Sequence, residues 1–72
     1  GYASSQYNIG ICYYKGEGTE QNFQKSIEYY QLAADRGHSS SQFNLAFFYE
    51  EGKIVERDLK KAIKYYFLSA NQ

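Results

Sequence analysis

Several residue types that mark particular classes of protein are scarce in this chain. It has no proline, methionine or tryptophan, one histidine and a single cysteine. Cys12 has no partner for an internal disulfide, and without a second cysteine or paired histidines there is no pattern typical of a metal site. A lone thiol favours a reducing compartment, so a cytoplasmic location is preferred to a secreted one. No metal or cofactor is expected.

An excess of charge of one sign is also missing. Eight Lys and Arg residues balance eight Asp and Glu residues, which gives a formal net charge of zero. This balance argues against a surface that attracts nucleic acid or anionic membranes. No apolar run is long enough to cross a bilayer, so direct membrane insertion is not expected. Four basic residues near the C-terminus are interpreted as a solvated edge: Arg57, Lys60, Lys61 and Lys64.

Aromatic residues, by contrast, are abundant. Nine tyrosines and five phenylalanines in 72 residues argue against disorder, because disordered chains are poor in aromatic side chains. A chain of this length forms at most one compact unit and hides only about 60% of its unfolded surface, so its stability is expected to be marginal. The chain starts at Gly1 and stops just past its last apolar segment, so it is expected to be an excerpt of a longer protein.

The sequence aligns with itself at an offset of 36 residues without a gap, so that residues 1–36 and 37–72 are two copies of one unit. A period between about 20 and 50 residues is the signature of stacked repeat proteins. Fourteen aligned positions are identical: Gly1/Gly37, Ser4/Ser40, Ser5/Ser41, Gln6/Gln42, Asn8/Asn44, Tyr13/Tyr49, Gly16/Gly52, Glu20/Glu56, Lys25/Lys61, Ile27/Ile63, Tyr29/Tyr65, Tyr30/Tyr66, Leu32/Leu68 and Ala34/Ala70.

Each copy has the apolar spacing of two helices and no alternation typical of strands. The expected helices cover residues 4–15, 23–35, 40–51 and 59–70. Asn22 and Asp58 are expected to cap the second helix of each copy, and Ser39 with Gln42 has the pattern of a capping box. The predicted fold is all-α: an α-α superhelix, or solenoid, of two helix-turn-helix repeats with four antiparallel helices.

Glycines and other small residues recur at positions that a helical hairpin requires. Three glycines follow predicted helices and are expected to end them: Gly16, Gly37 and Gly52. Small residues are expected to let the two helices of a repeat approach closely: Gly10 and Ser26 in one copy, Ala46 and Ala62 in the other. Large rings are expected to fill the space beside them: Tyr13, Tyr30, Tyr49 and Tyr66.

Three strings of the first copy carry a family pattern: Gln6-Tyr7-Asn8-Ile9-Gly10, Tyr13-Tyr14-Lys15-Gly16-Glu17-Gly18 and Lys25-Ser26-Ile27-Glu28-Tyr29-Tyr30. Together with Ala33-Ala34 and Gly37-His38, they resemble the Sel-one-like repeat (SLR) family, a tetratricopeptide-like α-solenoid. The second copy departs from the family pattern where Ile54 replaces the turn glycine Gly18. The resemblance implies a right-handed superhelix whose first helices line a concave face. It also implies adaptor or scaffold work, and no enzymatic activity of the repeats.

Residues of the first helix in each copy are the candidates for partner binding on that concave face. Asn8 and Asn44 share one helical phase and could hydrogen-bond a peptide backbone, or instead bond a neighbouring helix and fix the repeat geometry. The apolar candidates could either anchor a partner or pack between repeats, with Ile11 favouring the core and Tyr14 the surface: Tyr7, Ile11, Tyr14, Phe43 and Phe47.

Other features carry simpler interpretations. Gly16-Glu17-Gly18 follows a helix rather than a strand, so it is a turn and not a phosphate loop. Lys15 is expected opposite Glu50-Glu51 as part of a solvated face, and Cys12 is expected to be buried because it aligns with Phe48. His38 is expected to be a turn residue with no nucleophile beside it, so catalysis is not expected.

Two functions therefore remain in view. The leading hypothesis is a non-catalytic scaffold or adaptor module that binds a partner protein or peptide. The alternative is a structural spacer or self-association segment, attached to a regulatory, membrane or enzymatic domain outside these residues. Adjacent repeats or further copies would then pack on an exposed apolar face of the terminal helix, expected at Tyr65, Tyr66, Phe67 and Leu68.

Overall fold

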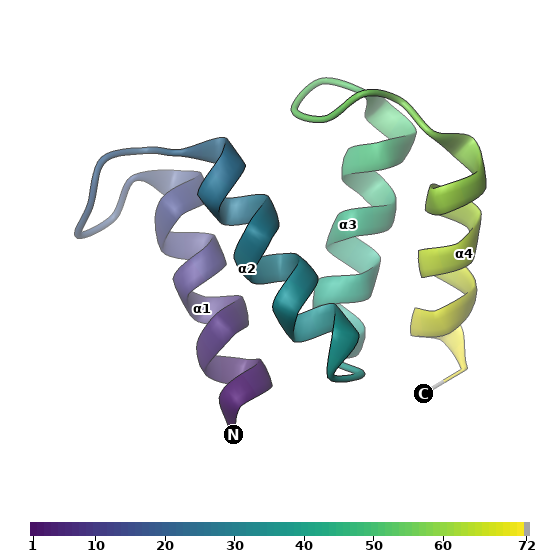
Figure 1. Cartoon of the computed structure of the whole chain (residues 1–72), viewed down its shortest axis with the longest axis horizontal. Helices are drawn as coiled ribbons and strands as arrows, with labels where there is room; N and C mark the ends of the chain where they lie inside the picture. Colours follow the sequence, from purple (N-terminus) through teal and green to yellow (C-terminus); the bar gives the residue numbers. More distant parts are fainter. Residues whose placement is uncertain (72) are drawn as a thin grey trace.

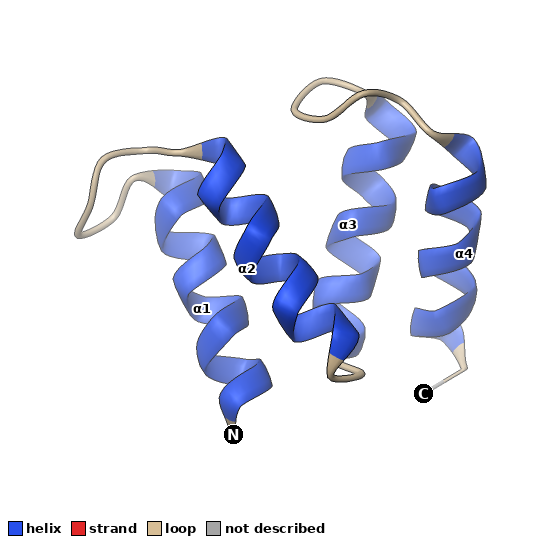
Figure 2. Cartoon of the chain, in the orientation of Figure 1, coloured by secondary structure: helices blue, strands red, loops and turns tan. Residues whose placement is uncertain are grey.

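The computed structural model of the chain, which describes residues 1–71, contains four helices and, over those residues, no strand (Figures 1 and 2). They are α1 (Tyr2–Lys15), α2 (Phe23–Asp35), α3 (Ser39–Glu51) and α4 (Leu59–Ala70). The helices run antiparallel in chain order, with α2 in contact with α1 and α3, and α3 in contact with α4. Two helical hairpins are therefore stacked side by side, which confirms the all-α prediction.

The predicted helix bounds are close to the observed ones. α2 and α4 cover the expected residues, whereas α1 begins two residues earlier than expected and α3 one residue earlier. The Asn22 side chain accepts a hydrogen bond from the Lys25 backbone N–H at 3.0 Å, and Asp58 accepts from Lys61 at 3.1 Å. Each side chain satisfies a backbone donor that the first turn leaves free, so both predicted caps are confirmed.

The predicted capping box at the start of α3 is wrong. The N-cap is His38, whose Nδ1 accepts from the Ser41 backbone N–H at 3.3 Å and lies 2.9 Å from the Ser41 Oγ. Ser39 is already helical, and its carbonyl accepts a hydrogen bond from the Ser69 hydroxyl at 3.0 Å. The Nδ1 atom of His38, two bonds from its Cβ, thus accepts from a backbone N–H at the start of α3, a role expected of the Ser39 hydroxyl.

Glycine ends the first helix of each repeat. Gly16 and Gly52 adopt left-handed conformations with φ of 76° and 68°, as expected for residues that follow a helix. A Cβ on Gly52 would lie 2.6 Å from the Cβ of Arg57, so the turn into α4 also needs the absence of a side chain there. Both glycines are thus required by the turn that connects the two helices of a repeat.

Small residues bring the helices of each hairpin together, as predicted. In the first repeat, the Ser26 hydroxyl donates to the Gly10 carbonyl at 2.8 Å, and a Cβ on Gly10 would lie 3.2 Å from the Tyr30 ring. In the second repeat, Ala46 and Ala62 occupy the same positions and are both buried. Both pairs of positions are therefore shielded from water, and in the first repeat a hydrogen bond joins them.

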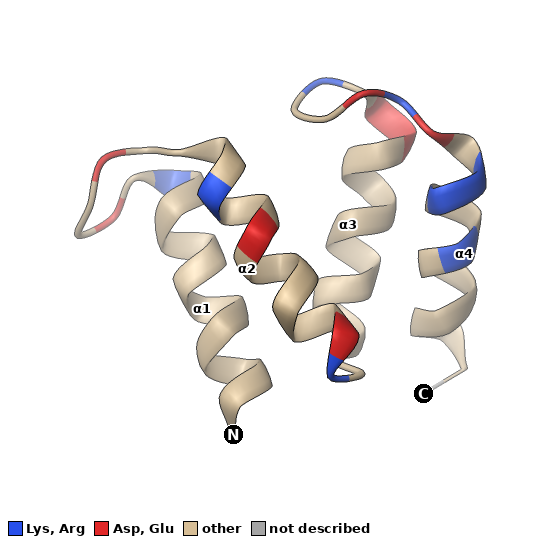
Figure 3. Ribbon diagram, in the orientation of Figure 1, with Lys and Arg blue, Asp and Glu red and all other residues tan. Residues whose placement is uncertain are grey.

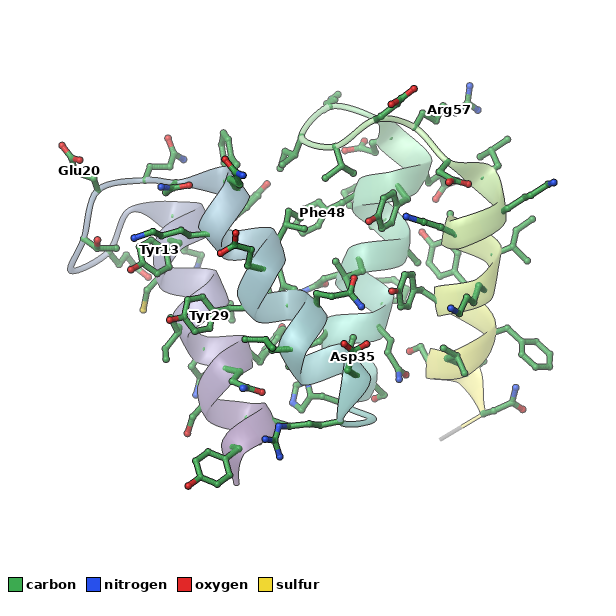
Figure 4. The ribbon with its side chains drawn as sticks, in the orientation of Figure 1. Tyr13, Glu20, Tyr29, Asp35, Phe48 and Arg57 are labelled. Atoms are coloured by element: carbon green, nitrogen blue, oxygen red, sulfur yellow. The ribbon has the colours of Figure 1, made fainter. Side chains whose placement is uncertain are left out.

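Stacked tyrosines join the two helices of each hairpin. Tyr13 lies on Tyr29 with ring centroids 5.9 Å apart, and Tyr49 lies on Tyr65 at 6.2 Å. Figure 4 shows Tyr13 and Tyr29 side by side on α1 and α2. The aromatic content of the chain is thus used within repeats as well as between them.

The core lies where α2 meets α3. Leu45 is fully buried there, and Phe48 packs on Tyr30 with ring centroids 5.6 Å apart. Gln42 donates to the Ala34 carbonyl at 3.1 Å across this interface. Cys12, which aligns with Phe48, is only partly buried, because the matching face of α1 has no helix of residues 1–71 against it. The prediction of a buried thiol is wrong for that reason.

The exposed apolar face of α4 agrees with the prediction in part. Phe67 and Leu68 are 69% and 38% exposed, as expected, and Leu59 and Ile63 form an exposed stripe with Phe67 at intervals of four residues. Tyr65, by contrast, is only 9% exposed, and its hydroxyl hydrogen-bonds with the Gln31 side chain on α2 at 2.7 Å. Residues four apart share a helix face, and the face that includes Tyr65 turns toward α2 and α3.

Candidate protein-binding groove

The first helices of the two repeats enclose a groove of about 360 Å³, here called the α1–α3 groove. It is lined by Tyr7, Ile11, Tyr14, Lys15, Tyr30, Asn44, Phe47 and Phe48. Five of the seven residues expected at a concave face therefore come together in space: Tyr7, Ile11, Tyr14, Asn44 and Phe47. A gapless repeat explains this convergence, since equivalent positions of α1 and α3 present equivalent faces.

The groove has a buried aromatic floor and exposed aromatic sides. Tyr30 and Phe48 are nearly inaccessible, whereas Tyr14 is 37% and Phe47 44% exposed. Tyr14 lies 5.6 Å from Phe48 and Tyr7 lies 5.6 Å from Tyr30, measured between ring centroids. Tyr14 and Tyr7 thus rest on buried rings, so the accessible face of Tyr14 is held by the core beneath it.

A hydrogen bond between repeats crosses the groove. The Asn44 side-chain amide on α3 donates to the Tyr7 hydroxyl on α1 at 3.3 Å. Asn44 was considered either for bonding a peptide backbone or for bonding a neighbouring helix, and this contact is of the second kind. The Tyr7 hydroxyl is still able to donate to a ligand at the same place.

Burial changes the acidity of the groove floor. Removal of the Tyr30 hydroxyl from water raises the pKa of Tyr30 to about 12, and the nearby Tyr7 acts in the same direction. Hydrogen bonds with Ser26 and Asn44 act in the opposite direction and offset only part of the rise. The floor is therefore neutral over the physiological range of pH.

Two candidate residues lie elsewhere. Phe43 is 52% exposed and packs edge-on against Tyr66 of α4, with ring centroids 5.5 Å apart. This pair is equivalent, 36 residues on, to the contact of Tyr7 with Tyr30 in the first repeat. Asn8 is exposed and does not line the groove. Its equivalent Asn44 reaches back to the preceding first helix, and no such helix precedes α1 among residues 1–71.

A second hollow, of about 340 Å³, was not predicted and is here called the loop pocket. It is lined by Tyr14, Phe23, Phe48, Glu51, Lys53 and Ile54. It shares Tyr14 and Phe48 with the α1–α3 groove, so the two hollows adjoin. The substitution of Ile54 for the glycine of the first repeat was the sequence signal for it. Figure 4 shows Phe48, common to both hollows, between α2 and α3.

Acidic residues gather at the end of α3, beside the loop pocket (Figure 3). Glu51 pairs with Lys53 at 4.0 Å, and Glu50 accepts a hydrogen bond from the Tyr66 hydroxyl at 2.7 Å. That bond, which the neutral hydroxyl donates, raises the pKa of Tyr66. Lys15, which was expected opposite these glutamates on a solvated face, is exposed and also lines the α1–α3 groove.

No group of three or more His, Cys, Asp or Glu side chains within residues 1–71 could hold a metal ion. A histidine and a serine do meet at His38 and Ser41, but Ser41 is fully buried and the pair forms the N-cap of α3. Over the same residues, no helix has the length and apolar character needed to cross a membrane.

Comparisons with known proteins agree on one family. The Sel1 repeat matches residues 3–38 and again residues 39–72. Among solved structures, the chain is 36% identical to a Sel1 repeat protein from Oxalobacter formigenes, with a TM-score of 0.91 over 97% of this chain and 29% of that one. It is 34% identical to c5321, a protective antigen of uropathogenic Escherichia coli with an SLR fold, with a TM-score of 0.91 over 99% of this chain and 15% of that one.

The chain thus spans less than a third of either solved relative. A search of curated proteins gave no match. Sel1 repeats commonly serve as protein-interaction modules, and their fold is a scaffold type. Two family matches cover nearly the whole chain, and the SLR-fold neighbours superpose on all four helices. The chain therefore belongs to the Sel1 repeat family.

Proposed function

We propose that the chain is a non-catalytic interaction module whose α1–α3 groove binds an extended segment of a partner protein. The observation that carries this proposal is the pair of exposed rings, Tyr14 and Phe47, above a buried aromatic floor. Aromatic anchors in a desolvated setting dominate the energetics of many protein interfaces. The Asn44–Tyr7 pair adds polar groups that can bond a peptide backbone between those anchors.

The size of the groove limits what it accepts. About 360 Å³ lies at the lower end of the range for ligand sites, which suits two or three side chains rather than a folded domain. A partner would therefore lay a short extended segment along α1 and α3. Further contacts would come from repeats that flank this pair in a longer array.

Two phenylalanines of α3 offer a matched test. Peptides selected from a displayed library on the 72-residue chain would be titrated against Phe47→Ala and Phe43→Ala variants by fluorescence anisotropy. Phe47 lines the groove and Phe43 does not, although both rings are about half exposed. We expect Phe47→Ala to weaken binding at least tenfold, which is about 1.4 kcal/mol of binding free energy. Phe43→Ala should change the affinity less than twofold. Equal losses, with helicity intact, would place the binding site elsewhere.

A structural role is the second candidate, favoured by the exposed stripe on α4. Ile63 and Phe67 are 67% and 69% exposed, which is unusual for large apolar side chains that share one helix face. In the internal interface the equivalent positions of α2 are Ile27, which packs on the core, and Gln31, which hydrogen-bonds with Tyr65 of α4. Light scattering at rising protein concentration tests whether the chain associates with itself. Association that is lost in Phe67→Glu would support a structural role, and a monomer at every concentration would contradict it.

A further inference from the structure

The loop pocket has the composition of a site for a positively charged side chain. Tyr14 lies 5.5 Å from Phe23 and 5.6 Å from Phe48 between ring centroids, so three aromatic rings form its walls. Tyr14 and Phe23 are 37% and 41% exposed, which leaves ring surface open to a ligand. The Glu51 carboxylate completes the lining, and aromatic faces beside a carboxylate attract cations.

Elsewhere in the molecule, four tyrosine rings are already covered by cations of the chain itself. Lys25 lies 5.4 Å from the centroid of Tyr13, and Lys61 lies 5.2 Å from that of Tyr49. Arg36 covers Tyr2 and Lys64 covers Tyr65 in the same way. Within residues 1–71, no lysine or arginine is found over Tyr14, Phe23 or Phe48. The rings of the loop pocket therefore remain open to an external cation.

Charge at the end of α3 favours the same ligand. The helix ends with Glu50 and Glu51, has no basic residue in its last turn and directs its free carbonyl groups toward this end. The carboxylates and the helix dipole add to one another, so a cation is attracted to the rim of the pocket (Figure 3). Lys53 compensates weakly, because its ammonium is 4.0 Å from Glu51 and its side chain is 78% exposed.

We propose that the loop pocket binds an arginine side chain of the partner segment, with its guanidinium over Tyr14 and Phe23 and paired with Glu51. Arginine fits better than lysine because a planar guanidinium both stacks on rings and forms two parallel hydrogen bonds with a carboxylate. The inference rests on the proposed function, since a segment in the α1–α3 groove reaches the loop pocket past their shared residues Tyr14 and Phe48.

Two residues of the α3–α4 loop set the strength of this site. Lys53 competes for Glu51, so its removal would leave the carboxylate free for the guanidinium. Ile54 supplies an apolar wall over the arginine stem where the first repeat has glycine. Lys53→Ala is thus expected to strengthen arginine binding and Ile54→Gly to weaken it. Opposite effects at neighbouring positions are not expected from general damage to the loop.

The test uses the 72-residue chain and the peptide acetyl-Gly-Arg-Gly-amide, with acetyl-Gly-Gln-Gly-amide as its uncharged counterpart. Amide shifts in nuclear magnetic resonance spectra would be followed during titration. We expect shifts at Phe23, Glu51 and Ile54 with the arginine peptide alone. Glu51→Gln should weaken binding about tenfold, and Lys53→Ala should strengthen it about threefold, which are the sizes expected of one exposed cation site. Lys61→Ala, whose ammonium lies over Tyr49 outside the pocket, is the matched control and should change nothing.

Three results would overturn the proposal: equal shifts with both peptides, binding that is unchanged by Glu51→Gln, or equal effects of Lys53→Ala and Lys61→Ala. Failure here is distinguishable from failure of the groove. If the tripeptide does not bind while Phe47→Ala still weakens the selected peptides, the proposed function stands and the arginine site is wrong. Binding of the tripeptide to the Phe47→Ala variant would show that the pocket acts independently of that anchor.

Discussion

α1 and α3 are near copies in sequence and differ sharply in burial. Leu45 on α3 is fully buried, whereas the aligned Ile9 on α1 is 40% exposed. Ser41 is likewise fully buried, and the aligned Ser5 is exposed. α3 lies between α2 and α4, while α1 packs mainly on α2 and meets α3 at fewer places, such as the Tyr7–Asn44 hydrogen bond. A repeat sequence therefore specifies the faces of its helices, and the neighbouring helices decide which of those faces are buried.

The same comparison separates two kinds of contact. The Gly10–Ser26 contact within the first repeat is matched by Ala46–Ala62 in the second, so both hairpins close in the same way. The contacts between repeats, such as Gln42 with Ala34 and Gln31 with Tyr65, have no counterpart on the outer faces of residues 1–71. Contacts within hairpins thus recur in both repeats, whereas contacts between repeats are concentrated at the one internal interface of residues 1–71.

The largest expected effect follows from that concentration. Leu45→Ala should lower the free energy of unfolding by about 2–5 kcal/mol, because it removes a fully buried side chain and leaves a cavity between α2 and α3. Ile9→Ala should cost less than about 1 kcal/mol, since much of that side chain is already in water. Urea unfolding followed by circular dichroism measures both. Equal losses would mean that the two helices are buried alike in solution.

Alkaline pH should destabilise the folded chain through Tyr30, at the buried floor of the α1–α3 groove. The pKa of Tyr30 is about 12 in the folded chain and about 10 when unfolded. Its contribution is therefore complete below pH 10 and is lost as the pH rises from about 10 to 12, by at most about 2.7 kcal/mol. In Tyr30→Phe this part of the loss should vanish, as measured by urea midpoints across that range. An unchanged pH dependence in the variant would show that Tyr30 is hydrated.

The hydrogen bond within the first hairpin provides a smaller test. Ser26→Ala should cost about 1 kcal/mol, because it removes a buried hydroxyl that donates to the Gly10 carbonyl at 2.8 Å. Ser40→Ala, at an exposed position of α3, is the control and should have almost no effect. Thermal unfolding of the two variants measures the difference. If Ser26→Ala is neutral, the apolar contact seen at Ala46 and Ala62 is sufficient by itself.

Local chemistry explains what could be predicted from the sequence. Asn22 and Asp58 act on the helix that directly follows them, so their roles as caps were readable from the chain alone. At the start of α3, His38 replaced the expected serine cap because its ring nitrogen reaches the Ser41 N–H. Propensity ranks the residues suited to a cap, and it does not determine which side chain lies closest to the free donors.

The site was predicted in part for a different reason. Tyr7, Tyr14 and Phe47 could be brought together from the repeat alone, because equivalent phases of α1 and α3 line the same groove. The loop pocket could not, since it depends on how Phe23 and Ile54 lie relative to each other across two repeats. Tyr65 was misplaced because the apolar pattern around it is nearly continuous, and its phase was resolved only by its contact with Gln31.

The smallest effect concerns the two equivalent tyrosines, whose acidity is changed by different causes. Burial raises the pKa of Tyr30, whereas the hydrogen bond to the Glu50 carboxylate is the main cause for Tyr66. Glu50→Gln should therefore lower the pKa of Tyr66 toward its ordinary value and leave that of Tyr30 at about 12. Nuclear magnetic resonance of ring-labelled tyrosine measures both in one titration, with assignment by Tyr66→Phe. Because Tyr66 is near the surface, stability at neutral pH should change by only a few tenths of a kcal/mol, about the size of an exposed pair. If the pKa of Tyr66 stays raised in Glu50→Gln, burial would be its main cause. The surroundings of Tyr66 in the second repeat would then exclude water as well as the interface between repeats does.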